Sequence, residues 1–383
     1  RRYRERENHI SSDSWPIYIS LQKDGILFKM RRTQDLPDKE SATMFFQDCK
    51  LAHQAQITGI SHSVKEILPP DLLDLTQLQK EANIRYGFTA SEVYDIAQSL
   101  YEKKLISYPR TSSRYLTEDV FDSLPPIMAR LLSWELFPAA KGTGGIDISN
   151  LSRHVISAEK ANVHHAIIIT GIRPGNLSEK EMQVYRLVAG RMLETFMAPC
   201  RIETTNVEAV CAAQHFKAEQ TRIIEAGWHD VFMRSDMVPK SGYSVNELPE
   251  VEKSDTLNVC GCNMVHKKQL PVNPFTDAEL VEYMEQNGLG TVSSRTNIIR
   301  TLVNRKYIRY SGKYIVPTPK GMFTYETIRG KKIADTSLTA DWEKQLAGLE
   351  SGMITGQDFL NRIRTLAKEM TDDIFNTYST KEE

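Results

Sequence analysis

The sequence has no long apolar run, few cysteines and almost no net charge. No run approaches the roughly 18 apolar residues that a membrane-spanning helix needs, and no signal peptide is visible. The five cysteines are odd in number and scattered, so they favour a reducing compartment over a disulfide framework. We therefore expect a cytoplasmic protein.

Metal and nucleotide motifs are also missing. Cys260-Gly-Cys262 stands alone, whereas a structural zinc site normally uses two cysteine pairs. Neither an Asp-x-Asp pair nor a Gly-x-Gly-x-x-Gly loop occurs. We therefore expect no resident metal or nucleotide cofactor in these 383 residues.

A formal net charge of −1 gives the whole chain no attraction to nucleic acid, so a DNA-binding surface must be local. Residues 291–332 contain ten basic residues against one acid, Glu326. A solvated face explains short charge runs, but an imbalance of this length favours a phosphate-binding surface. The ten are Arg295, Arg300, Arg305, Lys306, Arg309, Lys313, Lys320, Arg329, Lys331 and Lys332.

The remaining composition is ordinary for a soluble globular protein, and the chain is long enough for two or three domains. Apolar and polar residues alternate over residues 15–30 around a Lys-Asp-Gly turn, which predicts a β-hairpin. Helical character at 41–51 is followed by strand character at 56–64, and strand character returns at 202–232. These segments predict a β scaffold that a mainly helical insertion interrupts.

A helix–turn–helix–strand outline occurs over residues 72–108. Apolar residues recur at three- and four-residue steps, Gly87 breaks the run, and residues 89–92 form a Thr-Ala-Ser-Glu capping box. This outline is typical of a winged helix. The second helix is expected to turn five residues inward, namely Val93, Ile96, Ala97, Leu100 and Tyr101.

The same outline recurs over residues 276–316. Another capping box opens it, and a shift of 202 residues superposes Lys104 on Lys306 and Tyr108 on Tyr310. We therefore expect two paired winged helices. The repeat also makes Tyr310 an alternative to Tyr108 as a reactive tyrosine.

Tyr108 opens a Tyr-Pro-Arg-Thr sequence. Pro109 pushes Tyr108 into extended backbone, where Tyr108 and Arg110 point to the same side. A phenol has a pKa near 10, so it needs a nearby positive charge to act as a nucleophile, and Arg110 supplies one. Tyr310 is followed by Ser-Gly, which favours Tyr108. The alternative is that Tyr108 only packs and that Arg110 is a solvated surface charge.

The run from Pro69-Pro70 through residues 75–83 and 97–102 to the Tyr-Pro-Arg-Thr box resembles the active-site domain of type IA DNA topoisomerases, close to the topoisomerase III branch. Residues 162–170 are similar to the family's His-x-Ala-Ile-x-Pro-Thr box. The first histidine of that box falls on His164, and Ile169 stands where the family usually has proline.

This resemblance implies a mechanism. Tyr108 would cut one DNA strand by transesterification, leaving a 5′-phosphotyrosyl link and a free 3′-hydroxyl, without ATP. Arg110 would brace the phosphate and His164 would donate to it. The outcome would be relaxation of negative supercoils or decatenation. The further DNA contacts implied by the resemblance are Gln98, Thr111, Ser113, His165, Ser294 and Arg295.

The resemblance also implies an α+β multidomain fold, the core of a toroidal type IA topoisomerase. Its parts would be a discontinuous β-rich scaffold at 1–66 plus 200–250, a catalytic-tyrosine domain with a winged helix at 67–199, and a mainly helical domain with the second winged helix at 251–383. The first residue is Arg, so we expect a fragment without the family's N-terminal metal-binding domain. Mg²⁺ is expected in the longer enzyme and not in this fragment.

Single-stranded DNA is the expected partner of a monomer at the bacterial nucleoid or on plasmids, and a helicase is a further candidate partner. No membrane association is expected. Two other classes stay open: a non-catalytic DNA-binding protein with paired winged helices, and a structural β-helical adaptor. A covalent adduct between Tyr108 and DNA would separate the enzyme from both.

Overall fold

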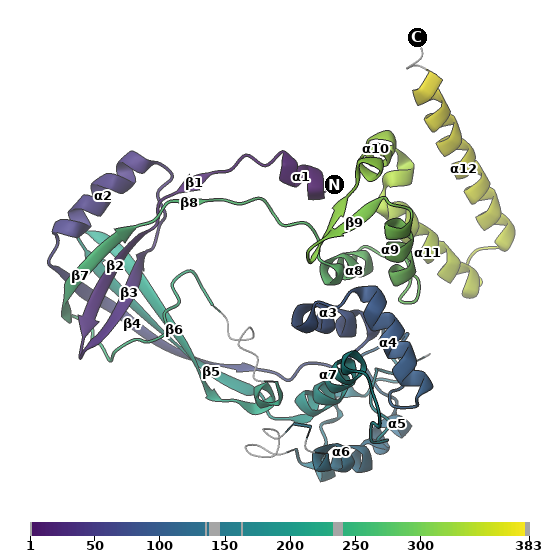
Figure 1. Cartoon of the computed structure of the whole chain (residues 1–383), viewed down its shortest axis with the longest axis horizontal. Coiled ribbons are helices and arrows are strands. Elements are labelled where there is room, and N and C mark those ends of the chain that lie inside the picture. Colours follow the sequence, from purple (N-terminus) through teal and green to yellow (C-terminus); the bar gives the residue numbers. More distant parts are fainter. Residues whose placement is uncertain (1, 135, 138–145, 162–163, 233–239, 380–383) are drawn as a thin grey trace. The chain divides into compact units, whose positions relative to one another are not determined.

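A computed structural model describes residues 2–134, 136–137, 146–161, 164–232 and 240–379 (Figure 1). The chain forms two compact units. Unit 1 consists of Arg1–Pro70, Leu132–Ser152 and Met192–Val272, and unit 2 consists of Asp71–Leu131, Arg153–Arg191 and Asn273–Glu383. The three-domain division expected from the sequence is finer and stays a prediction. None of the helices in the described ranges combines the length and apolarity needed to span a bilayer.

Unit 1 is built on a closed antiparallel β-barrel in the strand order β2-β3-β6-β5-β4-β7. Its strands are β2 Ile17–Lys23, β3 Ile26–Arg32, β4 Gln54–Ile67, β5 Cys200–Cys211, β6 Gln214–Glu225 and β7 Thr256–Met264. Its other elements are α1 Arg2–Glu7, β1 Asp13–Ser14, α2 Lys39–Leu51, η2 Ile148–Asn150, η4 Gly227–Val231 and β8 Lys267–Lys268.

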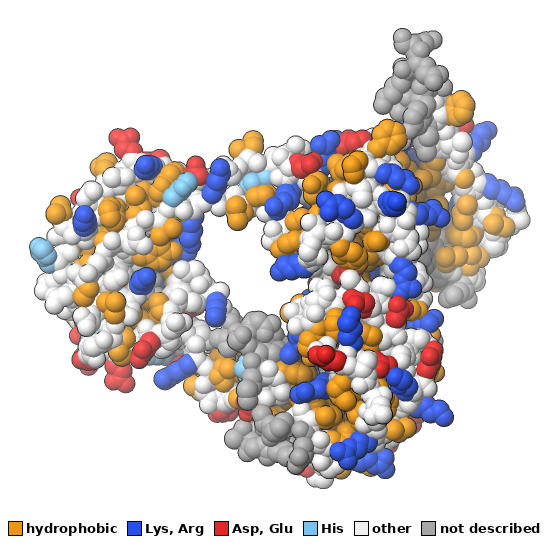
Figure 2. Space-filling model, in the orientation of Figure 1, with side chains coloured by type: hydrophobic (Ala, Val, Ile, Leu, Met, Phe, Trp, Pro, Cys, Tyr) orange, Lys and Arg blue, Asp and Glu red, His pale blue; other side chains and the backbone are white. Residues whose placement is uncertain are grey.

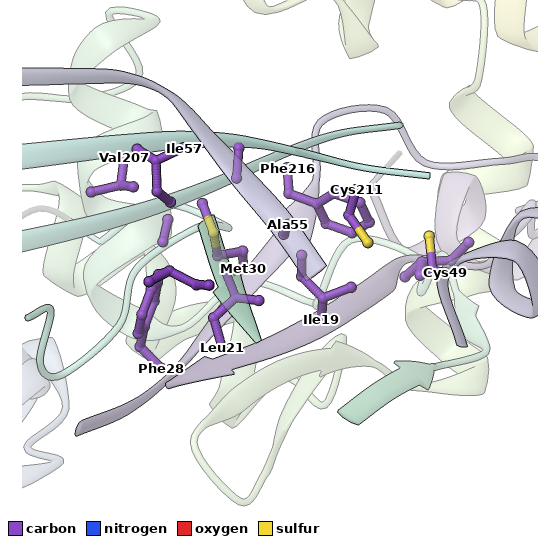
Figure 3. Close-up of a cluster of buried hydrophobic side chains, with 14 residues drawn as sticks. Ile19, Leu21, Phe28, Met30, Cys49, Ala55, Ile57, Val207, Cys211 and Phe216 are labelled. Atoms are coloured by element: carbon purple, nitrogen blue, oxygen red, sulfur yellow. The ribbon is translucent and has the colours of Figure 1, made fainter. Parts of the chain in front are cut away.

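Alternation along the strands fills the barrel. Ile17, Ile19 and Leu21 on β2 are fully buried, whereas the residues between them are partly exposed, because successive side chains of a strand point to opposite faces. Phe28 and Met30 on β3 join the same core, and Figure 3 shows Leu21, Phe28 and Met30 close together within it. The apolar interior therefore holds the barrel together.

The predicted β scaffold is confirmed in outline. The expected hairpin is β2–β3, and the strands expected at 56–64 and 202–232 are β4, β5 and β6. Strand β7, which closes the barrel between β4 and β2, was not predicted. The structural β-helical adaptor is wrong, because these strands form an antiparallel barrel.

Unit 2 contains most of the helices, and α7 carries the chain from it back to unit 1. Its helices and strands are α3 Leu75–Tyr86, α4 Ala90–Glu102, α5 Glu118–Asp122, α6 Leu124–Ser133, η3 Arg153–Val155, α7 Glu179–Phe196, α8 Asp277–Gln286, α9 Arg295–Asn304, β9 Ile308–Ser311, β10 Tyr314–Pro317, α10 Pro319–Ile328, η6 Lys332–Ala334, α11 Thr336–Glu350 and α12 Gly356–Ser379.

The two helix–turn–helix copies end in the same backbone turn. Lys104 and Lys306 both have a left-handed φ, of 59° and 58°, a conformation that disfavours residues with a side chain. In each copy, the residue after this lysine donates its N–H to the carbonyl five residues earlier at 2.9 Å. Thr170 and Thr318 then donate their hydroxyls to the two lysine carbonyls. The helix–turn–helix repeat predicted from the sequence is therefore present, but the hairpin of a winged helix follows only the second copy, as β9–β10, and residues 103–117 of the first copy contain only isolated bridges.

Buried polar contacts join the two copies within unit 2. The side-chain amide of Gln79 on α3 is 2% exposed and donates to the Thr296 hydroxyl on α9 at 3.0 Å. The Thr76 hydroxyl on α3 donates to Glu285 on α8 at 3.1 Å. A buried polar group that loses its partner costs roughly 1–3 kcal/mol, so these contacts specify how α3 pairs with α8 and α9.

Close packing of α10 on the hairpin yields a stability prediction. A Cβ added at Gly321 would lie 1.9 Å from the Tyr307 carbonyl oxygen, so the backbone must shift. We expect Gly321→Ala to lower the free energy of unfolding by roughly 2 kcal/mol or more.

The matched control is Gly356→Ala at the start of α12, where a Cβ would meet nothing within 4 Å. This change should cost nothing, because alanine favours a helix over glycine. Urea unfolding followed by circular dichroism checks both variants. Equal midpoints for Gly321→Ala and the unsubstituted chain would contradict the packing argument.

Candidate active site

The Tyr108 loop, residues 107–116, is anchored at its start to the chain near residue 166. The Ser107 N–H donates to the Ile168 carbonyl at 2.8 Å. Its hydroxyl donates to the Ala166 carbonyl at 3.1 Å and accepts the Ile168 N–H at 3.0 Å. Three hydrogen bonds to residues 166 and 168 thus fix Ser107, the residue that precedes Tyr108.

The middle of the Tyr108 loop is anchored on two sides. The Leu75 N–H, at the start of α3, donates to the Thr111 carbonyl at 3.1 Å. The Thr111 hydroxyl donates to the His164 carbonyl at 2.9 Å, and the Ala166 N–H donates to the Tyr115 carbonyl at 2.9 Å. Because the anchors lie before and after Tyr108, its position is set by the backbone of three segments.

Tyr108 is half-buried, and its ring lies against two aromatic side chains. The His164 ring centroid is 4.5 Å away at an interplanar angle of 49°, and the Tyr101 ring stands edge-on at 5.4 Å. The expectation that Tyr101 faces inward was wrong, since it is 39% exposed and contacts Tyr108 instead. Within the described part of the chain, the Tyr108 hydroxyl has no hydrogen-bond partner, so it is available to a ligand.

Arg110 is held in place without a carboxylate partner in the described residues. Its Nη2 donates to the Gln98 side-chain oxygen at 3.2 Å, and its guanidinium lies 5.1 Å from the centre of the Tyr94 ring. Its Nε is buried and has no acceptor in the part of the chain that the structure describes. A guanidinium that no carboxylate neutralises is suited to binding an anion, such as a phosphate.

The two histidines differ in their surroundings. His164 is exposed, and its ring lies against Tyr108. His165 is half-buried, and its Nδ1 donates to the Ala166 carbonyl at 2.7 Å, because a carbonyl can only accept. Residues 162–163, which open the predicted histidine box, lie outside the described residues. The structure thus brings His164, rather than His165, to Tyr108.

The other predicted DNA contacts fall into two groups. Thr111 and Ser113 are buried, and their hydroxyls bond within the unit: Thr111 donates to the His164 carbonyl, and Ser113 accepts the Tyr115 N–H at 3.1 Å. Ser294 precedes α9 and accepts the Thr291 N–H at 2.8 Å. Arg295 is 8% exposed and pairs with Glu285 at 3.1 Å. As DNA contacts, all four stay predictions.

Sequence reasoning missed a stripe on helix α4 that supports the Tyr108 loop. Tyr94, Gln98 and Tyr101 are spaced at i, i+4 and i+7, so they share one face of the helix. Tyr94 and Gln98 hold Arg110, and Tyr101 packs against Tyr108. The spacing of these three residues in the sequence could have indicated that they share a helix face. It could not have indicated that this face meets the Tyr108 loop.

The structure disfavours Tyr310 as the nucleophile. Partial burial raises the pKa of the Tyr310 hydroxyl, and the neighbouring Asp277 carboxylate adds to the shift, although the side chain keeps 37% of its surface exposed. A higher pKa leaves less phenolate at neutral pH. The choice of Tyr108 over Tyr310 is therefore supported by the surroundings of both tyrosines.

The basic run at 291–332 is only partly free to bind phosphate. Five of its ten cations form ion pairs: Arg295 with Glu285, Arg300 with Asp95, Arg329 with Glu326, Lys331 with Asp373 and Lys332 with Glu369. The other five have no ion pair within the described residues; they are Arg305, Lys306, Arg309, Lys313 and Lys320. Figure 2 shows Lys and Arg side chains over α9, α10 and the β9–β10 hairpin.

Comparisons with known proteins identify the family of this chain. Residues 1–361 match the family model described as DNA topoisomerase. DNA topoisomerase 3 of Bacillus licheniformis is 31% identical over 344 residues, which cover 84% of this chain and 47% of that protein. DNA topoisomerase 3 of Bacillus subtilis is 30% identical over 355 residues, covering 85% of this chain and 48% of that protein. The chain therefore spans about half the length of these relatives.

A solved structure agrees in fold. Full-length topoisomerase I from Thermotoga maritima superposes with a TM-score of 0.73 at 23% identity, covering 96% of this chain and 60% of that chain. The expected fold class and the resemblance to the topoisomerase III branch are thus confirmed. With its family model matched over nearly the whole length, the chain belongs to the type IA DNA topoisomerases, a family of isomerases.

Proposed function

We propose that this chain carries the strand-cutting centre of a type IA DNA topoisomerase. The Tyr108 oxygen attacks the phosphorus of a phosphodiester in single-stranded DNA. A bond between Tyr108 and the phosphate forms, the bond to the 3′ oxygen breaks, and the phenol proton ends on that oxygen. Because one ester replaces another, the 3′-hydroxyl can reverse the step without ATP.

One observation carries this proposal. The hydroxyl of Tyr108 has no partner in the described residues, although the loop around it is held by hydrogen bonds on both sides. Its ring lies against His164, and the next cation along the loop, Arg110, is held by Gln98 rather than by a carboxylate. A tyrosine that only packs normally buries its ring, and a buried hydroxyl normally has a protein partner.

Each neighbour has a proposed role. Arg110 stabilises the charge that develops on the phosphate in the transition state, and its Nη1, which has no partner among the described residues, is the donor for that task. His164 donates a hydrogen bond to a phosphate oxygen from its exposed position. Gln98 positions Arg110. Thr111, Ser113, His165, Ser294 and Arg295 are proposed to lie along the DNA strand.

The activity of the longer protein is part of the proposal. It relaxes negative supercoils or decatenates DNA as a monomer on single-stranded DNA at the nucleoid or on plasmids, with a helicase as a candidate partner. The proposed domains are 1–66 plus 200–250, 67–199 and 251–383, with β7 of the last range completing the barrel of the first.

Magnesium dependence is general in this family. Among the residues that the structure describes, no three His, Cys, Asp or Glu side chains gather where they could hold a metal ion. No step of the mechanism above passes through the ion.

A second candidate function is a non-catalytic DNA-binding protein with paired winged helices. The observation in its favour is the group of five cations without ion pairs around α9, α10 and the β9–β10 hairpin. Exposed cations of this kind bind phosphate without regard to sequence. In this function Tyr108 would serve only as packing.

Trapping on DNA separates the two functions. The probe is a single-stranded oligonucleotide in which sulfur replaces one bridging 3′ oxygen, because a thiolate is a better leaving group than an alkoxide. We expect the unsubstituted chain to form an adduct that survives denaturation, and Tyr108→Phe to form none. Loss of one hydroxyl should change the binding free energy by less than about 1 kcal/mol.

Tyr310→Phe is the matched control and should keep the adduct. Denaturing gel electrophoresis measures the adduct, and fluorescence anisotropy measures binding. DNA binding by the unsubstituted chain without any adduct would support the non-catalytic protein. An adduct that persists in Tyr108→Phe would overturn the assignment of the nucleophile.

Plasmid relaxation tests how much of the activity this chain holds. Because the chain spans about half the length of its relatives, we expect it to bind single-stranded DNA but to relax a negatively supercoiled plasmid weakly or not at all in Mg²⁺. Full-length DNA topoisomerase 3 of Bacillus subtilis in the same agarose-gel assay is the positive control. Robust magnesium-dependent relaxation by these 383 residues would contradict this expectation.

A further inference from the structure

Residues 108–114 of the Tyr108 loop alternate strictly between accessible and buried positions. Pro109, Thr111 and Ser113 are buried, whereas the residues at 108, 110, 112 and 114 are half-buried or exposed. Alternation of this kind is what extended backbone produces, because residues two apart share a face. The accessible row consists of Tyr108, Arg110, Ser112 and Arg114. It contains a phenol, two guanidinium groups and a hydroxyl. The proposed reaction uses only Tyr108 and Arg110, so Ser112 and Arg114 are still without a role.

Arg114 at the end of this row is held by a buried carboxylate. Its Nε donates to Asp74 at 2.7 Å, and the Asp74 side chain is 3% exposed. Asp74 also caps α3 by accepting the Gln77 N–H at 2.7 Å. Burial raises the pKa of the Asp74 carboxyl, and the contacts with Gln77 and Arg114 oppose that shift.

The contact with Asp74 leaves most of the guanidinium free. The Arg114 side chain is 35% exposed, and within the described residues its two Nη groups have no hydrogen-bond partner. A guanidinium has five N–H donors in a rigid fork, so fixing the Nε–H orients the other four. Asp74 thus holds the Arg114 guanidinium through a single nitrogen, as Gln98 holds the Arg110 guanidinium.

We propose that Arg114 binds a second backbone phosphate of the DNA strand that Tyr108 cuts, and that Asp74 is a positioning residue that orients it. Arg110 and Arg114 are four residues apart, so their Cα atoms are separated by at most about 14 Å. The second phosphate therefore lies a few nucleotides from the scissile one. This inference rests on the proposed function.

Salt dependence of binding gives a direct test. Each phosphate contact on a single strand contributes about 0.7 to the slope of log K against log salt concentration. We expect Arg114→Gln to reduce the magnitude of this slope by about 0.7 for a fluorescein-labelled oligothymidine measured by anisotropy, and Arg114→Lys to restore it. An arginine that only stabilises the fold would leave the slope unchanged.

Arg85→Gln is the matched control. Arg85 also donates its Nε to a carboxylate, that of Glu81, and is partly exposed, but it lies at the far end of α3. Its substitution should leave the slope unchanged. An unchanged slope in Arg114→Gln, in a chain that binds the oligonucleotide, would overturn the proposal for Arg114 while the proposed function stands. If the unsubstituted chain fails to bind at low salt, the proposed function itself falls.

A second measurement needs no variant and therefore does not depend on folding of a mutant. Phenylglyoxal modifies accessible arginines, and mass spectrometry of the digested chain reports each site. We expect the oligothymidine to slow modification of Arg114 severalfold and to leave Arg85 unaffected. Equal modification of Arg114 with and without the oligonucleotide would overturn the proposal.

Discussion

The hydrogen bond from the Thr111 hydroxyl to the His164 carbonyl is the contact on which the active-site geometry depends. It joins the loop that carries Tyr108 to the segment that carries the histidine, at 2.9 Å, and the Leu75 N–H holds the other side of the same residue. These segments are far apart in sequence, and backbone polar groups removed from water require partners. The loop satisfies that requirement with its own hydroxyls, and the result is that Tyr108 meets His164.

The side chains of the Tyr108 loop fall into two groups, those that stabilise the loop and those that keep unbonded polar groups. Ser107, Thr111 and Ser113 use their hydroxyls to stabilise the loop. Tyr108 and Arg110 keep groups that bond to none of the described residues, namely a phenol oxygen and the Nη1 donors of a guanidinium. We assign the reaction to these two groups, because a donor or nucleophile that already bonds within the fold would first have to break that bond.

Local patterns predicted much of this architecture. The turn at Lys-Asp-Gly, the capping boxes and the proline after Tyr108 act over a few residues, and the corresponding hairpin and helices are present. The repeat was also visible, and its left-handed lysines confirm it. Contacts between distant residues were not predictable. Counting charges at 291–332 could not reveal Asp95 or Glu285, which neutralise Arg300 and Arg295, and nothing local pairs Arg114 with Asp74.

The central claim is that the Tyr108 oxygen captures a DNA phosphate. Mass spectrometry of the DNA-linked peptide, after protease and nuclease digestion of a chain incubated with single-stranded DNA, tests it most directly. The account predicts a nucleotide attached through its 5′ phosphate to a peptide that contains Tyr108, with a free 3′ end on the released strand. Attachment to Tyr310 or another residue, or through a 3′ phosphate, would contradict it.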